Sequence, residues 1–358
     1  MKTVLVGVGQ AGGKLADRLV TFDRQRGYGS VQHALAINSA KPDLTSLAID
    51  TALIGQARVK GHGVGGDNEL GAEIMEAALP EVQQKIGNRI TTQAESIILS
   101  TGLGGGTGSG GTPVLARRLK EIYDIPVYVL GILPSTEESN LAQVNAGRSL
   151  KTITDIADAT LVIDNDAWKS TGESLTEGYE QINREIAKRI GLLLAAGEGT
   201  DGVAESVVDS SEVINTLRTG GIAAIGYNQV PAADSTEENI NTVMTATRSA
   251  LLSGLSLTGE TTAESALLVI TGKPDRISRK GVEKSRRWLE DETGSMQVRG
   301  GDFPTENDHI GALVVVGGVQ SSDRIEAFFE RANEAAAAPT ETESDSEKMF
   351  QNDQLEGI

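Results

Sequence analysis

Residues 102–111 read GLGGGTGSGG, and this density of glycine restricts the fold more than any other feature of the sequence. The segment follows an apolar run at 96–100, typical of a buried strand, and precedes apolar residues at helical spacing over 114–123. So many glycines cost backbone entropy, but they expose successive N–H groups that can surround a polyphosphate at a helix N-terminus. Because strand, loop and helix follow in this order, we interpret 102–111 as a phosphate-binding loop rather than a flexible linker.

A second glycine motif, GVGQAGG, occupies residues 7–13. It follows an apolar run at 4–8 and satisfies the G-x-G-x-x-G spacing of nucleotide-binding turns. Alone, it fits a dinucleotide site, a mononucleotide site or a tight turn. An NAD-dependent oxidoreductase expects an acidic residue at the end of the second strand to hold the ribose, but here that strand ends Ile37-Asn38-Ser39. The oxidoreductase alternative also leaves residues 102–111 without a role.

Apolar runs typical of strands alternate with helical patterns along most of the chain, which predicts an α/β fold with a parallel sheet covered by helices. The strands expected first are 4–8, 34–37, 97–99, 127–133 and 161–163, and the helices between them are 14–22, 69–86, 114–123 and 141–156. A long central helix is expected at 175–196. A smaller α/β unit should follow, with strands at 222–225, 266–270 and 313–316 and helices at 237–252, 279–290 and 323–331.

This order predicts a nucleotide-binding domain at 1–172, a connecting helix at 173–198 and a second α/β domain at 199–332. The remaining residues, 333–358, are rich in alanine and then in acidic residues, and they cannot bury enough apolar surface to fold. We expect a disordered acidic tail. Its end, 349–355, is either a docking motif for a protein partner or a spectator.

The formal net charge of −18 argues against binding to nucleic acid, whose phosphates require clustered lysine and arginine. The chain has no cysteine, which excludes disulfides and thiol chemistry, and its three scattered histidines give little support to a zinc site or a serine–histidine triad. No apolar run reaches the roughly 18 residues of a membrane span, and the first residues do not resemble a signal peptide. We expect a cytoplasmic protein whose acidity reflects either a salt-rich cytoplasm or the tail.

Four segments carry a resemblance to a known family. GGGTGSG at 104–110 resembles the tubulin signature, and GQAG at 9–12 resembles the first phosphate loop of tubulin. GVGGDN at 63–68 looks like the loop that senses the γ-phosphate, and DND at 164–166 resembles the segment whose asparagine contacts the nucleotide. Over most of 1–330 the chain is similar to the tubulin and FtsZ superfamily of GTPases. With NSAK at 38–41 and the acidic tail, it looks most like the archaeal tubulin-like CetZ family.

The resemblance implies a GTP or GDP site with Mg²⁺ and no metal ligand from the protein itself. The residues that it assigns to the nucleotide's phosphate side and neighbouring loops are Gly9, Gln10, Ala11, Gly12, Gly13, Lys14, Asn38, Gly65, Gly66, Asp67, Gly104, Gly105, Gly106, Thr107 and Gly108. Lys14 stands where relatives carry an amide near the base, so the affinity for the base is left open.

The guanosine end can be argued partly from spacing. Tyr179 and Asn183 lie four residues apart on the central helix, so both side chains project from one face. A tyrosine ring can stack on a purine, and an asparagine amide can read the edge of guanine; the alternative is a core aromatic beside a surface amide. The resemblance adds Asn165 to the guanine pocket and Glu138 to the ribose, with Glu137 as a near-equal candidate.

Residues 208–213, VDSSEV, resemble the loop whose acids orient the water that attacks the γ-phosphate. In the family this loop lies opposite the nucleotide, so Asp209 and Glu212 would act on GTP held by the next subunit. Hydrolysis would then depend on head-to-tail assembly into an open filament, serving cell shape, motility or division. The alternative for these residues is a helix N-cap, and the rival function is a GTP-binding regulator that does not polymerise.

Overall fold

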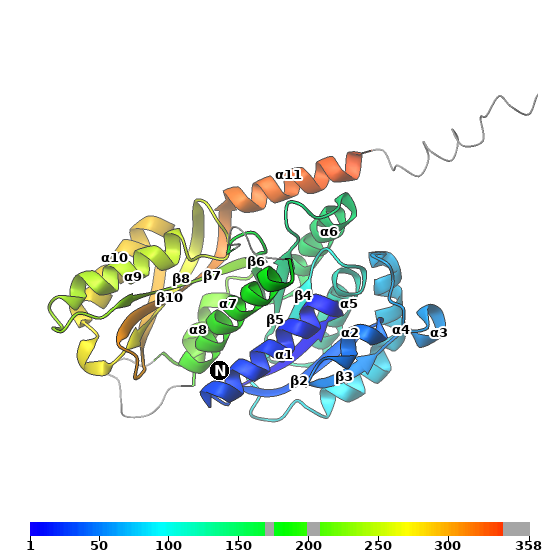
Figure 1. The fold of residues 1–358 in the computed structure, drawn as a ribbon, viewed down its shortest axis with the longest axis horizontal. Helices are drawn as coiled ribbons and strands as arrows, with labels where there is room; N and C mark the ends of the chain where they lie inside the picture. The colour runs from blue at the N-terminus through cyan, green and yellow to red at the C-terminus, as the bar shows by residue number, and fades with distance from the viewer. Residues whose placement is uncertain (169–174, 199–207, 339–358) are drawn as a thin grey trace, which may run out of the picture.

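A computed structural model describes residues 1–168, 175–198 and 208–338. The strands in this part of the chain form one ten-stranded sheet in the order β3-β2-β1-β4-β5-β6-β7-β10-β8-β9 (Figure 1). Their bounds are β1 (Thr3–Val8), β2 (Val31–Asn38), β3 (Asp50–Leu53), β4 (Ser96–Gly102), β5 (Val127–Leu133), β6 (Ala159–Asp164), β7 (Ile222–Pro231), β8 (Thr261–Gly272), β9 (Gln297–Pro304) and β10 (His309–Ser322).

The sheet changes from parallel to mainly antiparallel pairing where the two predicted domains meet. From β3 to β7 all neighbours are parallel, and β7 joins β6 through the pairs Thr160↔Ile222 and Leu161↔Ala223. Beyond that point β10 runs antiparallel to both β7 and β8, while β9 is parallel to β8. Because β1, β4, β5 and β6 run the same way, the loops at their carboxyl ends meet at one edge, where ligands of open parallel sheets bind.

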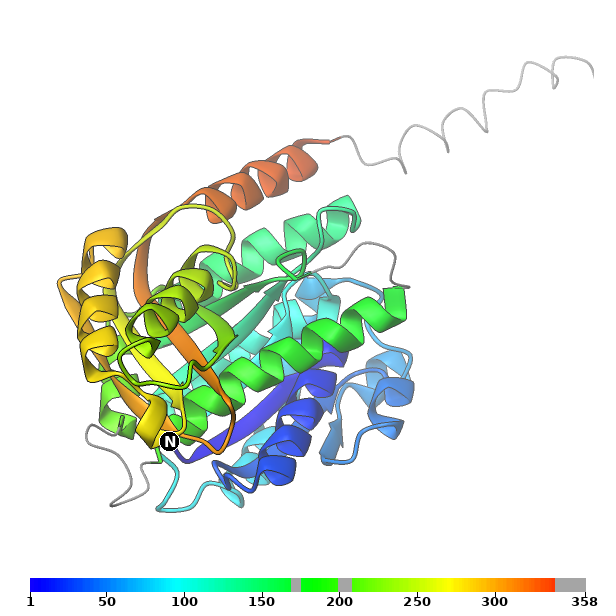
Figure 2. The ribbon, with the colours of Figure 1, turned by 60° about the vertical axis from the view of Figure 1, so that its left-hand side comes forward.

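Helices cover both faces of the sheet (Figures 1 and 2). The described helices are α1 (Gly9–Arg26), α2 (Lys41–Thr45), α3 (Gln56–Val59), α4 (Asn68–Gly87), α5 (Gly106–Ile122), α6 (Asn140–Ile156), α7 (Leu175–Ala196), α8 (Ser210–Leu217), α9 (Asn239–Leu252), the short 3₁₀ helix η1 (Pro274–Arg276), α10 (Arg279–Thr293) and α11 (Asp323–Ala337). On one face, α1, α7 and α8 bury a core that includes Leu15, Ile190 and Val213. A second core, including Leu115 and Phe328, lies under α4, α5, α6, α9, α10 and α11.

The central helix α7 lies beside α1 on the first of these faces (Figure 2). Ile182, Ile186 and Ile190, which lie at helical spacing, are buried, whereas Tyr179 is 43% exposed. Arg189 of this helix donates hydrogen bonds to main-chain oxygens of Tyr227 and Gly254 beyond the junction. The helix therefore packs against both predicted domains. Within the described residues, no helix is both long and apolar enough to span a bilayer.

The predicted α/β class is confirmed, and every predicted strand and helix corresponds to an observed element. Two strands were missed, β3 and β9, because one has four residues and the other, QVRGGDFP, lacks an apolar run. The predicted start of the tail at 333 was wrong. Helix α11 continues to Ala337, since alanine has the highest helix propensity. The rest of the predicted tail, 339–358, lies outside the described residues.

Candidate nucleotide-binding and catalytic site

A cavity of about 510 Å³ opens at the carboxyl edge of the parallel strands. Its walls come from the loops after β1, β4, β5 and β6 and from the N-terminal half of α7. Sixteen of the nineteen residues predicted to bind nucleotide line it: Gly9, Gln10, Ala11, Lys14, Asn38, Gly65, Gly66, Gly104, Gly105, Gly106, Thr107, Gly108, Glu138, Asn165, Tyr179 and Asn183. The fold thus brings together residues that are up to 174 positions apart, from Gly9 to Asn183.

Two helix N-termini point into this cavity. Helix α1 starts at Gly9 and α5 starts at Gly106, and neither N-cap residue, Val8 or Gly105, caps the first turn with its side chain. The first N–H groups of a helix have no partner within the helix, and they carry partial positive charge. Gly105 borders open space, because a Cβ there would meet nothing within 4 Å. These two helix starts therefore suit the phosphates of a nucleotide.

Gly12, Gly13 and Asp67 do not line the cavity. A Cβ on Gly12 would lie 2.0 Å from the main-chain oxygen of Ser100, so this glycine allows α1 to pack on β4. Asp67 is the N-cap of α4 and accepts the N–H of Leu70 at 2.9 Å. A Cβ on Gly13 would lie 3.2 Å from Leu47 Cδ1, so this glycine also packs against a neighbouring segment instead of lining the cavity.

The other end of the cavity is built from side chains. Tyr179 and Asn183 face it from α7, and Asn165 enters from the turn after β6, where it is 5% exposed. Glu138 lines the cavity and accepts the N–H of Ser135 at 2.9 Å, whereas Glu137 does not line it. This geometry favours Glu138 over Glu137 as the ribose contact.

Sequence reasoning missed two ionisable side chains that line the cavity, Asp43 and His62. The Asp43 carboxylate accepts the amide of Asn38 at 3.0 Å and that of Gln10 at 3.1 Å. No spacing signal marks Asp43, because it reaches the cavity through helix α2. Among the described residues no three acidic or histidine side chains gather to hold a metal. Mg²⁺ would therefore need phosphate oxygens as ligands, as is usual for Mg²⁺ bound with a nucleotide, with Asp43 as the nearby carboxylate.

Asp209 and Glu212 lie at the opposite edge of the sheet. Asp209 is the N-cap of α8; it accepts the N–H of Glu212 at 3.0 Å and the hydroxyl of Ser211 at 2.5 Å. Those bonds lower the pKa of Asp209, with the Ser211 hydroxyl contributing most. Burial raises the pKa of Glu212, and the charge of Asp209 adds to the shift. The capping alternative thus describes the geometry of Asp209, and its carboxylate is nevertheless exposed.

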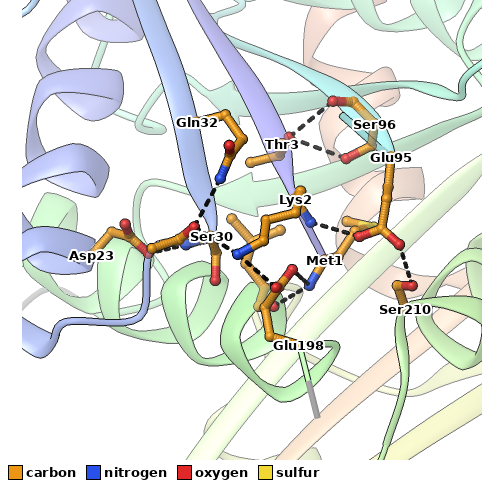
Figure 3. A network of polar contacts seen from close by, with 12 residues as sticks. Met1, Lys2, Thr3, Asp23, Ser30, Gln32, Glu95, Ser96, Glu198 and Ser210 are labelled. Atoms are coloured by element: carbon orange, nitrogen blue, oxygen red, sulfur yellow. Dashed lines mark hydrogen bonds and ion pairs between the residues drawn. The ribbon is translucent and has the colours of Figure 1, made fainter. Parts of the chain in front are cut away.

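A polar network fixes the start of α8 to the amino edge of the sheet (Figure 3). Glu95, just before β4, accepts the hydroxyl of Ser210 at 2.5 Å and the main-chain N–H of Lys2 at 2.7 Å. Glu198 forms ion pairs of 2.8 Å with the Lys2 ammonium and the Met1 amino group, and it forms a β-bridge with Asp209. Since β4 runs seven residues from this edge to the cavity, the two ends are about 20 Å apart at a rise of ~3.3 Å per residue.

Comparison with known proteins matches both the N-terminal and the C-terminal part of the chain to one family. Residues 2–173 match the GTPase domain of the Tubulin/FtsZ family, and 172–334 match the C-terminal domain of tubulin-like CetZ. Tubulin-like protein CetZ2 of Haloferax volcanii is 60% identical over 359 residues, which cover 100% of both chains. The chain belongs to the tubulin-like CetZ family. The prediction of a tubulin-like cytoskeletal GTPase is therefore confirmed, and the oxidoreductase alternative is not supported.

Two solved structures show how closely the fold follows that family. A protofilament of CetZ2 from Haloferax volcanii, bound to GTPγS, superposes with a TM-score of 0.91 at 61% identity, over 94% of this chain and 99% of that one. A GDP-bound monomer of CetZ1 from the same organism gives a TM-score of 0.86 at 46% identity, over 94% of this chain and 100% of that one.

Proposed function

We propose that this GTPase assembles head to tail into cytoplasmic filaments and hydrolyses GTP at each contact between subunits. One observation carries the proposal: the cavity lies at the carboxyl edge of the parallel strands, whereas Asp209 and Glu212 lie at the amino edge. Carboxylates about 20 Å away, at ~3.3 Å per strand residue, cannot reach the nucleotide of their own chain. A second copy, stacked end to end, brings them to it, and such a contact does not close on itself. The CetZ2 protofilament bound to GTPγS supports this arrangement.

In this proposal the phosphate side and the guanosine side of the cavity have separate tasks. The main chain of 9–11 and 104–108 binds the phosphates with Mg²⁺, which supplies charge neutralisation during phosphoryl transfer. The ring of Tyr179 stacks on guanine, Asn165 and Asn183 bind its edge, and Glu138 accepts a ribose hydroxyl. The corresponding domain division is the one predicted from the sequence, 1–172, 173–198 and 199–332.

The carboxylates of α8 position the attacking water. Asp209, like any exposed aspartate, is ionised at neutral pH, and its hydrogen bonds lower its pKa further. It can accept a hydrogen bond from a water at the γ-phosphate of the next subunit. Water adds its oxygen to the γ-phosphorus, the bond to the β-phosphate oxygen breaks, and GDP and phosphate leave, with the water's proton passing to a carboxylate or to solvent. Phosphoryl transfer depends on such positioning and on charge stabilisation more than on covalent help.

Mixing two inactive variants tests catalysis between subunits. Gly105→Asp places a carboxylate where the phosphates would bind, while aspartate is a favoured N-cap that keeps α5 intact. Asp209→Asn keeps the cap of α8 but removes the charge. Each variant alone should hydrolyse little GTP with Mg²⁺. The mixture should recover activity, because the intact cavity of one variant meets the intact α8 of the other.

Phosphate release and light scattering should be measured together over a range of protein concentrations, with ATP in place of GTP as the control. Activity per molecule that rises with concentration, for GTP only, supports the proposal. If the mixture shows no recovery although it scatters light, or if wild-type turnover per molecule is independent of concentration, hydrolysis does not occur between subunits. A regulator that does not polymerise would bind GTP without any change in scattering.

A further inference from the structure

Helix α11 contributes a buried charge to the loops around the cavity. Arg324, in its first turn, donates from Nη2 to Asp164 Oδ1 at 2.7 Å and from Nε to Asp164 Oδ2. The two side chains are 9% and 2% exposed, so the pair is desolvated on both sides. Such two-pronged pairs fix both distance and orientation. Breaking one from the arginine side leaves a buried carboxylate without its counter-charge.

Asp164 shapes the turn that presents Asn165. It is the last residue of β6, and its Oδ1 also accepts the N–H of Asp166 at 3.1 Å. The main-chain oxygen of Asp164 accepts the N–H of Ala167 at 3.1 Å, which closes the turn. Asn165 lies within this turn, between Asp164 and the residues that donate to it. The orientation of its amide in the cavity therefore depends on the carboxylate that Arg324 holds.

The same chain of contacts reaches Glu138. The Asp166 carboxylate lies 3.9 Å from Arg324 Nη2, and it accepts the hydroxyl of Ser135 and the N–H of Thr136, each at 2.8 Å. Ser135 in turn donates its N–H to Glu138 at 2.9 Å. The turn after β6 and the loop after β5 are thus joined through two aspartates that both lie close to the Arg324 guanidinium.

Helix α11 also packs on the helix that follows this loop. It leaves β10 and lies along α6 (Figures 1 and 2). Phe328 is fully buried, and a Cβ on Gly147 of α6 would lie 2.9 Å from the Cβ of Ala332. Because α6 begins at Asn140, directly after the loop of Glu138, this packing places the first turn of α11, which carries Arg324, beside that loop.

We propose that Arg324 is a positioning residue for the guanosine end of the nucleotide. Through Asp164 and Asp166 it holds Asn165 and Glu138 in place, and its ion pairs go to these two aspartates and not to the loops at 9–11 and 104–108. Substitution of Arg324 should therefore change the affinity for the nucleoside part of the nucleotide and not the affinity for its phosphates. The inference rests on the proposed roles of Asn165 at the base and Glu138 at the ribose.

The test compares a ligand with a nucleoside and a ligand without one. Arg324→Gln should weaken GTP binding about 10-fold, a typical coupling between linked sites, and should leave the affinity for inorganic tripolyphosphate with Mg²⁺ unchanged. Arg324→Lys keeps the charge without the planar fork, so it should show a smaller loss and serves if the first variant does not fold. Calorimetric titration of the full chain with both ligands gives the two affinities.

Phe328→Leu is the matched control, because it loosens α11 without touching the ion pair. It should lower the melting temperature and leave the preference for GTP over tripolyphosphate unchanged. The inference is overturned if Arg324→Gln weakens both ligands equally, or if Phe328→Leu reproduces its selective loss.

Asn165→Ala and Glu138→Ala separate this inference from the assignment on which it rests. A selective loss of GTP binding in these two variants, without one in Arg324→Gln, removes the role of Arg324 and leaves the proposed site intact. No selective loss in either of them shows instead that the guanosine assignment is wrong.

Discussion

The phosphate end of the cavity and the start of α8 are built in opposite ways. The phosphate end consists mainly of main chain, and its glycines are packed so closely that a Cβ on Gly106 would lie 2.5 Å from Val64 Cγ2 and one on Gly108 would lie 2.6 Å from Thr101 Oγ1. The start of α8 presents a side-chain carboxylate, Asp209, on the surface. The proposed binding groups are thus main-chain atoms inside packed loops, whereas the proposed catalytic group is an exposed side chain.

This difference separates two kinds of mutational effect. Changes among the packed glycines should disturb the fold and binding together, because in the proposed site the backbone itself binds the phosphates. Changes at α8 can remove catalysis and leave the fold intact, because an exposed side chain contributes little to stability. The variants below test that separation.

The largest effect is expected at Gly105, the position of the phosphate loop that borders open space. Gly105→Asp should lower GTP affinity by about 100-fold or more, since placing like charges together costs several kcal/mol. Its unfolding free energy should stay within about 0.5 kcal/mol of wild type, because aspartate caps the helix well. Gly105→Ala should fold and bind normally. Titration calorimetry and urea unfolding measure the two quantities.

Gly106→Ala completes this series, because its Cβ would meet Val64 and the main chain of Gly66. It should lose about 1–3 kcal/mol of stability, as overpacked sites do, and bind GTP less well. If Gly105→Asp bound GTP normally, the phosphates would not lie at the start of α5.

Asp209→Asn should reduce turnover by about 100-fold, the lower range for loss of a group that handles the proton of the attacking water. Asparagine is an equally good N-cap, so stability and GTP affinity should remain within about 0.5 kcal/mol of wild type. Single-turnover hydrolysis at assembled concentrations measures the effect. A comparable fall in GTP affinity would place Asp209 in the binding site. The phosphate end of the cavity and the start of α8 would then not have separate roles.

Ser210→Ala should reduce turnover by about 5-fold, because the loss of one hydrogen bond, roughly 1 kcal/mol, releases α8 from Glu95. GTP affinity should not change, since the cavity lies at the other edge of the sheet. Thr152→Ala, which removes an exposed hydroxyl from α6, is the control. Unchanged turnover in Ser210→Ala would show that the network in Figure 3 stabilises the fold without positioning Asp209.

The smallest effect is a shift in pH dependence. The pKa of Glu212 is raised by burial and that of Asp209 is lowered by hydrogen bonds. On acidification Glu212 therefore becomes protonated first and loses its charge, and turnover should fall at a pH above the ordinary carboxyl range of about 4. Glu212→Gln should remove this fall while lowering turnover at neutral pH. A wild-type profile that is flat from neutral pH to about pH 5 would mean that the charge of Glu212 is not needed.

The sequence predicted the elements of the fold well and the site unevenly. Hydrophobic periodicity located the main strands and helices, and the spacing of Tyr179 and Asn183 placed both on one face, where they line the cavity. Asp43 was missed because it lies on a five-residue helix without a motif. Arg324 was missed because its partner, Asp164, is 160 residues away in the chain.

The sequence by itself determined the glycine loops, the helix starts that follow them and the acidic cap of α8, because turn chemistry and helix capping depend on neighbours a few residues apart. Only the tertiary structure decided which acids meet which bases and on which edge each group lies. Parallel strands bring the loops after β1, β4 and β6 to one edge and leave α8 at the other. No local sequence pattern encodes that separation. It is the physical reason to propose that each subunit needs the next one to hydrolyse its GTP.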